Sequence, residues 1–246
     1  MSTKPKETNI LFLHGFPFSP EMWSPQRAAL ETQGYRVIAP DLRLETSPAT
    51  MDAMADRAVA ALDAAGAANA VVVGFSMGGY VAFSLLEKYP DRVAALVLAD
   101  TRAEADSEEG KAGRRTLAAN ALEKGPQAAV DAMLGKLLSP KTRESRPDVA
   151  REAERIMLTA KPAAIAAAAL GMAERKDRTS ELPGIRVPTL VIVGEDDVIT
   201  PPDVARKMAD AIPGASQTVI PHAGHLSNLE RPEPFNETLS AWLAKL

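Results

Sequence analysis

The sequence predicts an α/β protein: one parallel sheet flanked by helices and interrupted by an all-helical insertion. Short runs of β-branched and aliphatic residues alternate with longer amphipathic segments over residues 9–99 and again over residues 189–246. Between 104 and 182 the strand-like runs disappear, and Ala, Glu, Lys and Arg dominate. Strands that alternate with helices are typical of a parallel sheet covered by helices on both faces.

Six short apolar runs predict the strands, and most of them end at a turn signal such as Gly, Pro or Asp. They lie at 9–13, 35–39, 71–73, 93–99, 189–193 and 216–220. Helices are expected between them. The first should begin with Ser19 as its cap and Pro20 in its first turn, and it should end near Gly34. Further helices are predicted at 51–65, 80–89, from 202 onward and at 232–246.

The insertion is predicted to contain four or five helices, because breaks at proline divide a segment of strong helix formers. We therefore expect a core domain made of residues 1–103 and 183–246, and a helical cap at 104–182. The alanine-rich run at 163–170 is interpreted as a tightly packed helix and not as low-complexity disorder.

Composition excludes several classes of function. The chain has 246 residues, of which 46% are hydrophobic, and its net charge is −4. Nothing in this balance favours nucleic acid or an anionic membrane as a partner. The chain has no cysteine, which rules out disulfides, thiolate metal sites and a cysteine nucleophile. Met1–Thr8 lacks the apolar core of a signal peptide, so we expect a cytoplasmic protein, either a monomer or a homodimer.

A candidate nucleophile lies within Val71–Gly79, which reads V-V-V-G-F-S-M-G-G. The three valines predict a buried strand and Tyr80–Tyr89 predicts a helix, so Ser76 falls on a sharp strand-to-helix turn. Glycine is needed beside the serine because a Cβ there would clash with the neighbouring strand or helix. Such a turn lifts Oγ clear of the sheet and places it at the positive end of a helix.

A serine nucleophile needs a base, and the chain has three histidines: His14, His222 and His225. His225 lies in the loop after the last predicted strand and is the candidate base. His222 is the competitor, and a surface histidine is the ordinary alternative. A metal site formed by these two is disfavoured, because no carboxylate or third histidine stands nearby at a suitable spacing.

The candidate acid is Asp197, which follows the strand at 189–193. The adjacent Asp196 could exchange roles with it or serve as a turn residue, and Asp100, which ends the strand at 93–99, is the alternative acid. The order Ser76, Asp197, His225 is the order that the fold requires. All of these residues fall at the carboxyl ends of predicted strands, where parallel sheets bind their ligands.

Oxyanion stabilisation is expected from two backbone N–H groups. His14-Gly15-Phe16 follows the strand that should pair with the serine strand, so the N–H of Phe16 can point at a substrate carbonyl oxygen. The N–H of Met77, directly after the serine, is the second donor. His14 itself is interpreted as structural, because a catalytic role for it would leave His225 without one.

Four motifs in this order resemble the α/β-hydrolase superfamily: H-G-F-P at 14–17, G-F-S-M-G-G at 74–79, G-E-D-D at 194–197 and G-H at 224–225. The segment L-A-D-T-R-A-E-A-D at 98–106 looks like the branch of 3-oxoadipate enol-lactonase-like esterases and carboxylesterases. The resemblance implies that Ser76 is the nucleophile, Asp197 the acid and His225 the base, with Phe16 and Met77 forming the oxyanion hole. It implies no cofactor and no metal.

Two departures from the superfamily pattern affect one side of the sheet. Members usually begin with an antiparallel strand pair, but only eight residues precede Asn9 here, so we expect about six parallel strands with 35–39 at one edge. The glycine loop D-L-R-G-x-G-x-S is shortened to D-L-R-L-E-T-S at 41–47. Both changes could widen the site entrance or favour dimerisation.

The expected activity is cleavage of small to medium carboxylic esters or lactones through an acyl-enzyme. The cap is expected to act as a lid whose underside selects substrate. Met133, Leu137 and Met157 could line the pocket and Trp23 could reach the acyl side, with ordinary packing as the alternative for each. Carbon–carbon bond hydrolysis or perhydrolysis on the same triad is a near alternative, and a non-catalytic ligand-binding protein of this fold is a different one.

Overall fold

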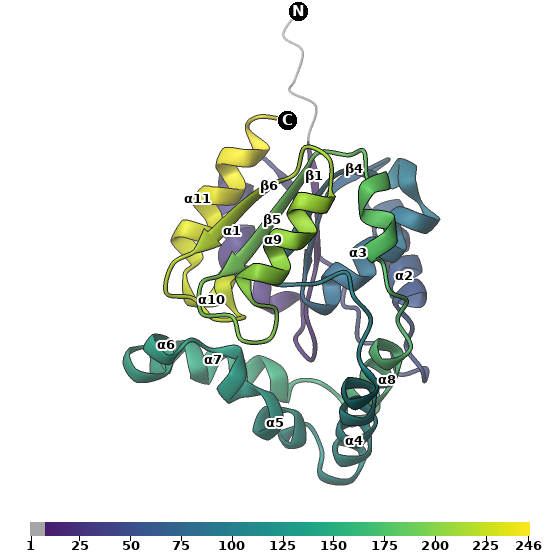
Figure 1. Ribbon diagram of the computed structural model, residues 1–246, viewed down its shortest axis with the longest axis vertical. Coiled ribbons are helices and arrows are strands. Elements are labelled where there is room, and N and C mark those ends of the chain that lie inside the picture. Colours follow the sequence, from purple (N-terminus) through teal and green to yellow (C-terminus); the bar gives the residue numbers. More distant parts are fainter. Residues whose placement is uncertain (1–7) are drawn as a thin grey trace, which may run out of the picture.

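The computed structural model of the protein describes residues 8–246, and the polar stretch 1–7 lies outside them (Figure 1). Its core is a six-stranded sheet in the order β2-β1-β3-β4-β5-β6. Every pairing in this sheet is parallel and β2 is an edge strand, as predicted. The strands are β1 (Asn9–Leu13), β2 (Arg36–Ile38), β3 (Ala70–Phe75), β4 (Val93–Ala99), β5 (Thr189–Gly194) and β6 (Ser216–Ile220).

The alternation of side chains along the strands builds a hydrophobic core on each face of the sheet. In β1, Leu11 and Leu13 face one core, whereas Ile10 and Phe12 face the other. The central strand β3 is buried along its whole length, as expected of a strand that is covered on both sides. The sheet is therefore a rigid base for the loops that follow its strands.

Helices cover both faces of the sheet. Three of them pack on the Leu11 side: α2 (Met51–Ala64), α3 (Met77–Lys88) and α9 (Pro202–Ala211). Two others pack on the Ile10 side: α1 (Ser24–Thr32) and α11 (Pro232–Leu243). Ser19 caps a short 3-10 turn that leads into α1, and its Oγ accepts a hydrogen bond from the Glu21 N–H at 3.3 Å. Within residues 8–246 no single helix could span a membrane, although the bent pair of helices at Pro147–Leu158 and Pro162–Ala173 passes by length and composition.

Five further helices follow β4 and lie together beyond the carboxyl ends of the strands (Figure 1). They are α4 (Glu108–Lys124), α5 (Gln127–Leu137), α6 (Pro140–Ser145), α7 (Pro147–Leu158) and α8 (Pro162–Ala173). α8 contains the alanine run and packs on α4 through small buried side chains such as Ala118, Ala121 and Ala167. This arrangement supports our proposal that 104–182 is a cap on the core.

The cap is attached to the loop that follows β6. The Leu226 N–H donates to the Leu137 carbonyl, at the end of α5, over 3.1 Å. Glu230, in the short helix α10 (Ser227–Glu230), is buried, and its two carboxylate oxygens accept from the N–H groups of Gly224 and Ser139, each at 2.8 Å. One carboxylate therefore joins the β6 loop to the α5–α6 junction.

Candidate active site

Ser76 sits on the predicted strand-to-helix turn, between β3 and α3. Its backbone is in the left-handed region, with φ of 52° and ψ of −114°, which is strained for a serine. The turn is possible because glycine flanks it: a Cβ at Gly78 would lie 2.1 Å from the Leu13 carbonyl oxygen, and a Cβ at Gly74 would lie 2.5 Å from the Gly78 carbonyl oxygen. The strained turn presents Oγ at the start of α3.

Three side chains from distant parts of the chain meet at this turn. His225 Nε2 lies 2.9 Å from Ser76 Oγ, and His225 Nδ1 lies 2.8 Å from Asp197 Oδ2. Because a carboxylate only accepts, Nδ1 carries the proton and Nε2 is free to accept the serine proton. The imidazole is held between these two partners and the ring of Phe75, whose centroid is 5.2 Å away. The structure thus brings together the three residues that the sequence singled out.

Asp197 is buried and takes four hydrogen bonds. Besides His225, it accepts from the N–H groups of Ile199 and Thr200 at 2.8 and 3.0 Å, and from the Thr200 hydroxyl at 2.5 Å. Burial by itself raises the pKa of this carboxyl, but the charge of His225 and the bonds from His225 and Thr200 outweigh it and lower the pKa to about 2. Asp197 is therefore ionised in the neutral range and can orient an imidazolium.

The two expected oxyanion donors border one small cavity. Within residues 8–246 the N–H groups of Phe16 and Met77 donate to no backbone acceptor, so both are free for a ligand. His14 lies buried beneath the loop, where Nδ1 donates to the Gly15 carbonyl at 2.9 Å and Nε2 accepts from the Leu42 N–H at 2.8 Å. This pairing sets the tautomer of His14 and leaves it no acceptor for a substrate proton.

The cavity beside Phe16 and Met77 has a volume of about 10 Å³, the room of roughly one water molecule. Its far wall comes from the cap: Ala160, Ala164, Ile165 and Ala168. Sequence reasoning missed these residues, because spacing along a helix does not say which small side chains face the core. The one available signal was the alanine run itself, which leaves space where larger residues would fill it.

Arg43 also lines this cavity and follows the edge strand. Its guanidinium is neutralised by Asp41, with Nη2 2.6 Å from Oδ2, and Nη1 donates to Thr159 in the cap at 2.8 Å. Burial raises the pKa of Asp41, but hydrogen bonds from the guanidinium and the backbone N–H of Arg43 hold it well below its usual range. The shortened loop after β2 therefore joins the oxyanion loop to the cap by polar contacts.

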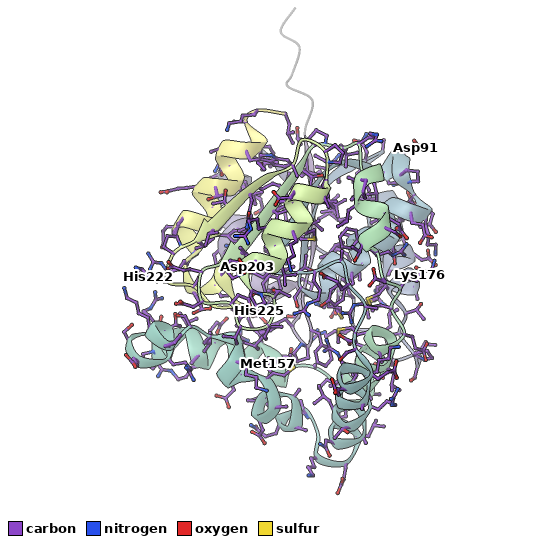
Figure 2. The ribbon with its side chains drawn as sticks, viewed as in Figure 1. Asp91, Met157, Lys176, Asp203, His222 and His225 are labelled. Atoms are coloured by element: carbon purple, nitrogen blue, oxygen red, sulfur yellow. The ribbon has the colours of Figure 1, made fainter. Side chains whose placement is uncertain are left out.

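The four residues proposed from sequence as pocket lining are not among those that line the small cavity beside Phe16 and Met77. Trp23 is 1% exposed and stacks on Phe12 with ring centroids 4.4 Å apart, on the Ile10 face of the sheet. Leu137 and Met157 are fully buried in the same hydrophobic cluster, and Met133 is partly buried beside it. Figure 2 shows Met157 on the cap side of the boundary and His225 on the core side. A role for these four residues in substrate binding stays a prediction.

His225 contacts Ser76 and Asp197, and the alternatives His222 and Asp196 take other contacts. His222 is exposed at the outer edge of the molecule, with Nδ1 3.6 Å from Glu195 (Figure 2). Asp196 is half-buried, and its N–H donates to the Ala223 carbonyl at 2.8 Å. Among residues 8–246 no group of three or more His, Asp or Glu side chains is arranged to hold a metal ion.

The protein has a sheet of six parallel strands with a serine on the turn after β3. An imidazole and a carboxylate reach this serine from the loops after β6 and β5. This combination is typical of hydrolases that are built on a parallel sheet. Residues 8–232 match the family described as alpha/beta hydrolase fold, and the chain belongs to this family.

Three relatives give the family context. A thermophilic esterase from Thermogutta terrifontis, solved with malate bound, is 42% identical over 97% of this chain and 90% of that one, with a TM-score of 0.93. The enol-lactonase from Burkholderia xenovorans LB400 is 28% identical over 98% of this chain and 92% of that one, with a TM-score of 0.89. A protein of Variovorax paradoxus named "Putative carbamate hydrolase RutD" is 31% identical over 96% of this chain and 92% of its own length.

Proposed function

We propose that this protein is a serine hydrolase that cleaves small to medium carboxylic esters or lactones through an acyl-enzyme intermediate. The observation that carries the proposal is the continuous chain of hydrogen bonds from Ser76 Oγ through His225 to Asp197, at 2.9 and 2.8 Å. This contact is within the range that proton transfer to a general base requires.

In the first half of the reaction, His225 Nε2 accepts the Ser76 proton as Oγ attacks the acyl carbon. The carbonyl oxygen becomes an oxyanion, which the free N–H groups of Phe16 and Met77 stabilise. His225 then gives its proton to the leaving alkoxide, so that the alcohol departs and the acyl group stays on Oγ. Asp197 remains ionised throughout and stabilises the imidazolium.

In the second half, water replaces the alcohol. His225 removes a proton from this water, the resulting hydroxide attacks the acyl carbon, and the oxyanion returns to the same two N–H groups. His225 finally protonates Ser76 Oγ, which releases the carboxylic acid and restores the free protein. With a lactone the leaving alkoxide belongs to the acyl group itself, and the product is a hydroxy acid.

The substrate class rests on two observations. Esterase and enol-lactonase structures are similar to this chain over nearly its whole length. The cavity beside the oxyanion donors is lined by apolar side chains of the cap such as Ala164 and Ile165, and its size of about one water molecule leaves little room for a long acyl chain.

The test uses a fluorophosphonate probe and p-nitrophenyl esters of graded acyl length, with one lactone and one β-diketone. We expect the wild-type chain to be labelled and to release nitrophenol fastest from the short esters. Ser76→Ala should abolish labelling and lower kcat by at least about 10³-fold. Ser216→Ala removes an exposed hydroxyl at the start of β6 and should leave both readouts unchanged.

Each alternative has its own outcome in this panel. A chain that neither labels nor exceeds the Ser76→Ala rate is a ligand-binding protein, and the proposal is wrong. A labelled chain that cleaves the β-diketone but not the esters is a carbon–carbon bond hydrolase. Formation of peracid when hydrogen peroxide replaces water as acyl acceptor identifies perhydrolysis.

A further inference from the structure

Asp100 is a buried carboxyl group that the mechanism above does not use. It follows β4, which lies between the serine strand β3 and the acid strand β5, and it is fully buried. Its backbone is in the left-handed region, with φ of 46°, which is uncommon for a residue with a side chain. Burying a carboxyl group on a strained backbone costs free energy of folding, and the contacts that Asp100 makes must offset this cost.

The side chain of Asp100 bonds to two loops at once. Oδ1 accepts from the Gly194 N–H at 2.8 Å, and Oδ2 accepts from the Ser227 hydroxyl. Gly194 ends β5 and begins the loop that carries Asp197, and Ser227 begins α10 just after His225. Asp100 is therefore bonded directly to the segments that hold the acid and the base.

The neighbours of Asp100 reach the nucleophile as well. The Ser76 N–H donates to the Ala99 carbonyl at 2.9 Å, and the Thr101 hydroxyl donates to the Ser76 carbonyl at 2.8 Å. Residues 99–101 thus contact all three segments that supply the triad. The acid loop is also bonded directly to residues before His225, because the Glu195 N–H donates to the Ile220 carbonyl at 3.0 Å and the Asp196 N–H to the Ala223 carbonyl at 2.8 Å. Asp100 adds a tie on the other side of His225, to Ser227.

We propose that Asp100 is a positioning residue, whose side chain fixes the loop carrying Asp197 relative to the loop carrying His225. The proposal rests on the proposed function, because it assigns to Asp100 the task of holding the acid and base in register. On this proposal, Asp100 contributes to catalysis by fixing the positions of Asp197 and His225, and the charge of its carboxyl group plays no part.

The surroundings of Asp100 favour an uncharged carboxyl group. Burial raises its pKa well above the ordinary value, the negative charges of Asp197 and Glu230 raise it further, and the bonds from Ser227 and Gly194 only partly offset this. A neutral carboxyl group can keep both contacts, because the Ser227 hydroxyl is able to accept as well as donate. An asparagine amide can make the same two contacts.

The experiment compares Asp100→Asn with Asp100→Ala, using p-nitrophenyl acetate as substrate. Asp100→Asn should keep kcat within about 3-fold of wild type, whereas Asp100→Ala should lower kcat by roughly 10–100-fold with little change in KM, as expected for a small misplacement of catalytic groups. Asp91→Ala is the matched control, since Asp91 is exposed at the opposite end of β4 and should have no effect (Figure 2).

The pH profile distinguishes positioning from electrostatics. The acid limb of kcat/KM follows protonation of the base, and a charged carboxylate near it would favour the imidazolium. Replacing a neutral Asp100 by Asn should leave this limb in place. A shift of the limb to lower pH by more than about half a unit would show that Asp100 acts through its charge and would overturn the proposal.

A double variant distinguishes positioning from mere support of the fold. In a His225→Ala background the base is already lost, so adding Asp100→Ala should lower the residual rate by less than about 2-fold. An equal loss in both backgrounds, or an Asn variant as poor as the Ala variant, refutes the proposal. A wild-type chain that fluorophosphonate does not label refutes the proposed function itself, and the positioning role with it.

Discussion

His14 Nε2 accepts a hydrogen bond from the backbone N–H of Leu42 at 2.8 Å, and this contact joins the oxyanion loop to the neighbouring edge of the sheet. The opposite ring nitrogen donates to the Gly15 carbonyl at 2.9 Å, directly before Phe16. A single buried imidazole therefore fixes the peptide that presents the Phe16 N–H. His14 supports the site without being placed to take the serine proton.

The first prediction concerns His14→Ala. Without the imidazole the loop at 14–17 loses two hydrogen bonds, and the Phe16 N–H is held less firmly. We expect kcat to fall by roughly 10–100-fold, somewhat less than the loss of an oxyanion donor outright, while the fluorophosphonate probe still labels Ser76, more slowly. Steady-state kinetics on p-nitrophenyl acetate and the labelling rate measure both effects.

His222→Ala is the matched control for this prediction, because His222 is an exposed histidine at the outer edge of the molecule. It should leave kcat unchanged. If His14→Ala were as inactive as His225→Ala, His14 would take part in proton transfer, and the assignment of the base would have to be revised.

The second prediction concerns the glycines. An alanine Cβ at Gly78 would lie 2.1 Å from the Leu13 carbonyl oxygen, so the backbone of β1 or α3 must shift. We expect Gly78→Ala to lower the free energy of unfolding by about 3 kcal/mol, which corresponds to roughly 6–12 °C in Tm. Gly113 in α4 has open space around it, and Gly113→Ala should raise stability by up to about 1 kcal/mol. Differential scanning calorimetry measures both; equal Tm values for the two variants would contradict the crowding argument.

Much of the fold could be predicted from the sequence, because local signals are strong where a parallel sheet alternates with helices. The predicted limits of β1, β4 and β6 agree with the structure to the residue, since these runs ended at clear turn signals. The predicted start of α3 at Tyr80 was late: the helix begins at Met77, and two glycines masked its first turn. The short helix α10 had no periodic pattern to reveal it.

The site was predictable only in part, for a physical reason. Ser76, Asp197 and His225 each follow a predicted strand, and they occur in the order Ser, Asp, His along the chain. Their residue types and this order were enough to identify them as candidates. Asp100 was named only as the alternative acid, because its contacts with Gly194 and Ser227 join residues that are far apart in sequence. Thr200 and Glu230 are ordinary residue types, and neither their burial nor the contact of Glu230 with Ser139 is visible in the sequence. The cap wall of the cavity depends on which side of α8 faces the core, and a helix that is apolar all round gives no such signal.

The third prediction concerns Glu230. Its two carboxylate oxygens each accept from a buried backbone N–H, those of Gly224 and Ser139. A glutamine can satisfy only one of them and turns an NH2 group toward the other. Glu230→Gln should therefore lower the free energy of unfolding by about 1–3 kcal/mol. Urea denaturation measures the change.

Glu233→Gln, on the exposed first turn of α11, is the control for loss of one carboxylate and should have little effect. Because Ser139 belongs to the cap, Glu230→Gln should also make the α5–α6 junction easier to cleave by a protease. Unchanged stability together with unchanged proteolysis would mean that this contact does not join the cap to the core.

The last prediction is a pH dependence of stability that belongs to Asp197. Its pKa is lowered from 3.8 to about 2 in the folded chain, so the folded state favours the ionised form. The stabilisation is present in full above pH 4 and is lost as the pH falls from about 4 to about 2; the difference in pKa corresponds to about 2 kcal/mol. Measured by urea denaturation, the unfolding free energy of wild type should therefore fall by about 2 kcal/mol more than that of Asp197→Asn across this window.

Asp203→Asn, on the exposed first turn of α9, controls for the loss of one charge. Parallel pH curves for wild type and Asp197→Asn would show that the imidazole and Thr200 do not stabilise the carboxylate, and would remove the electrostatic basis for Asp197 as the acid.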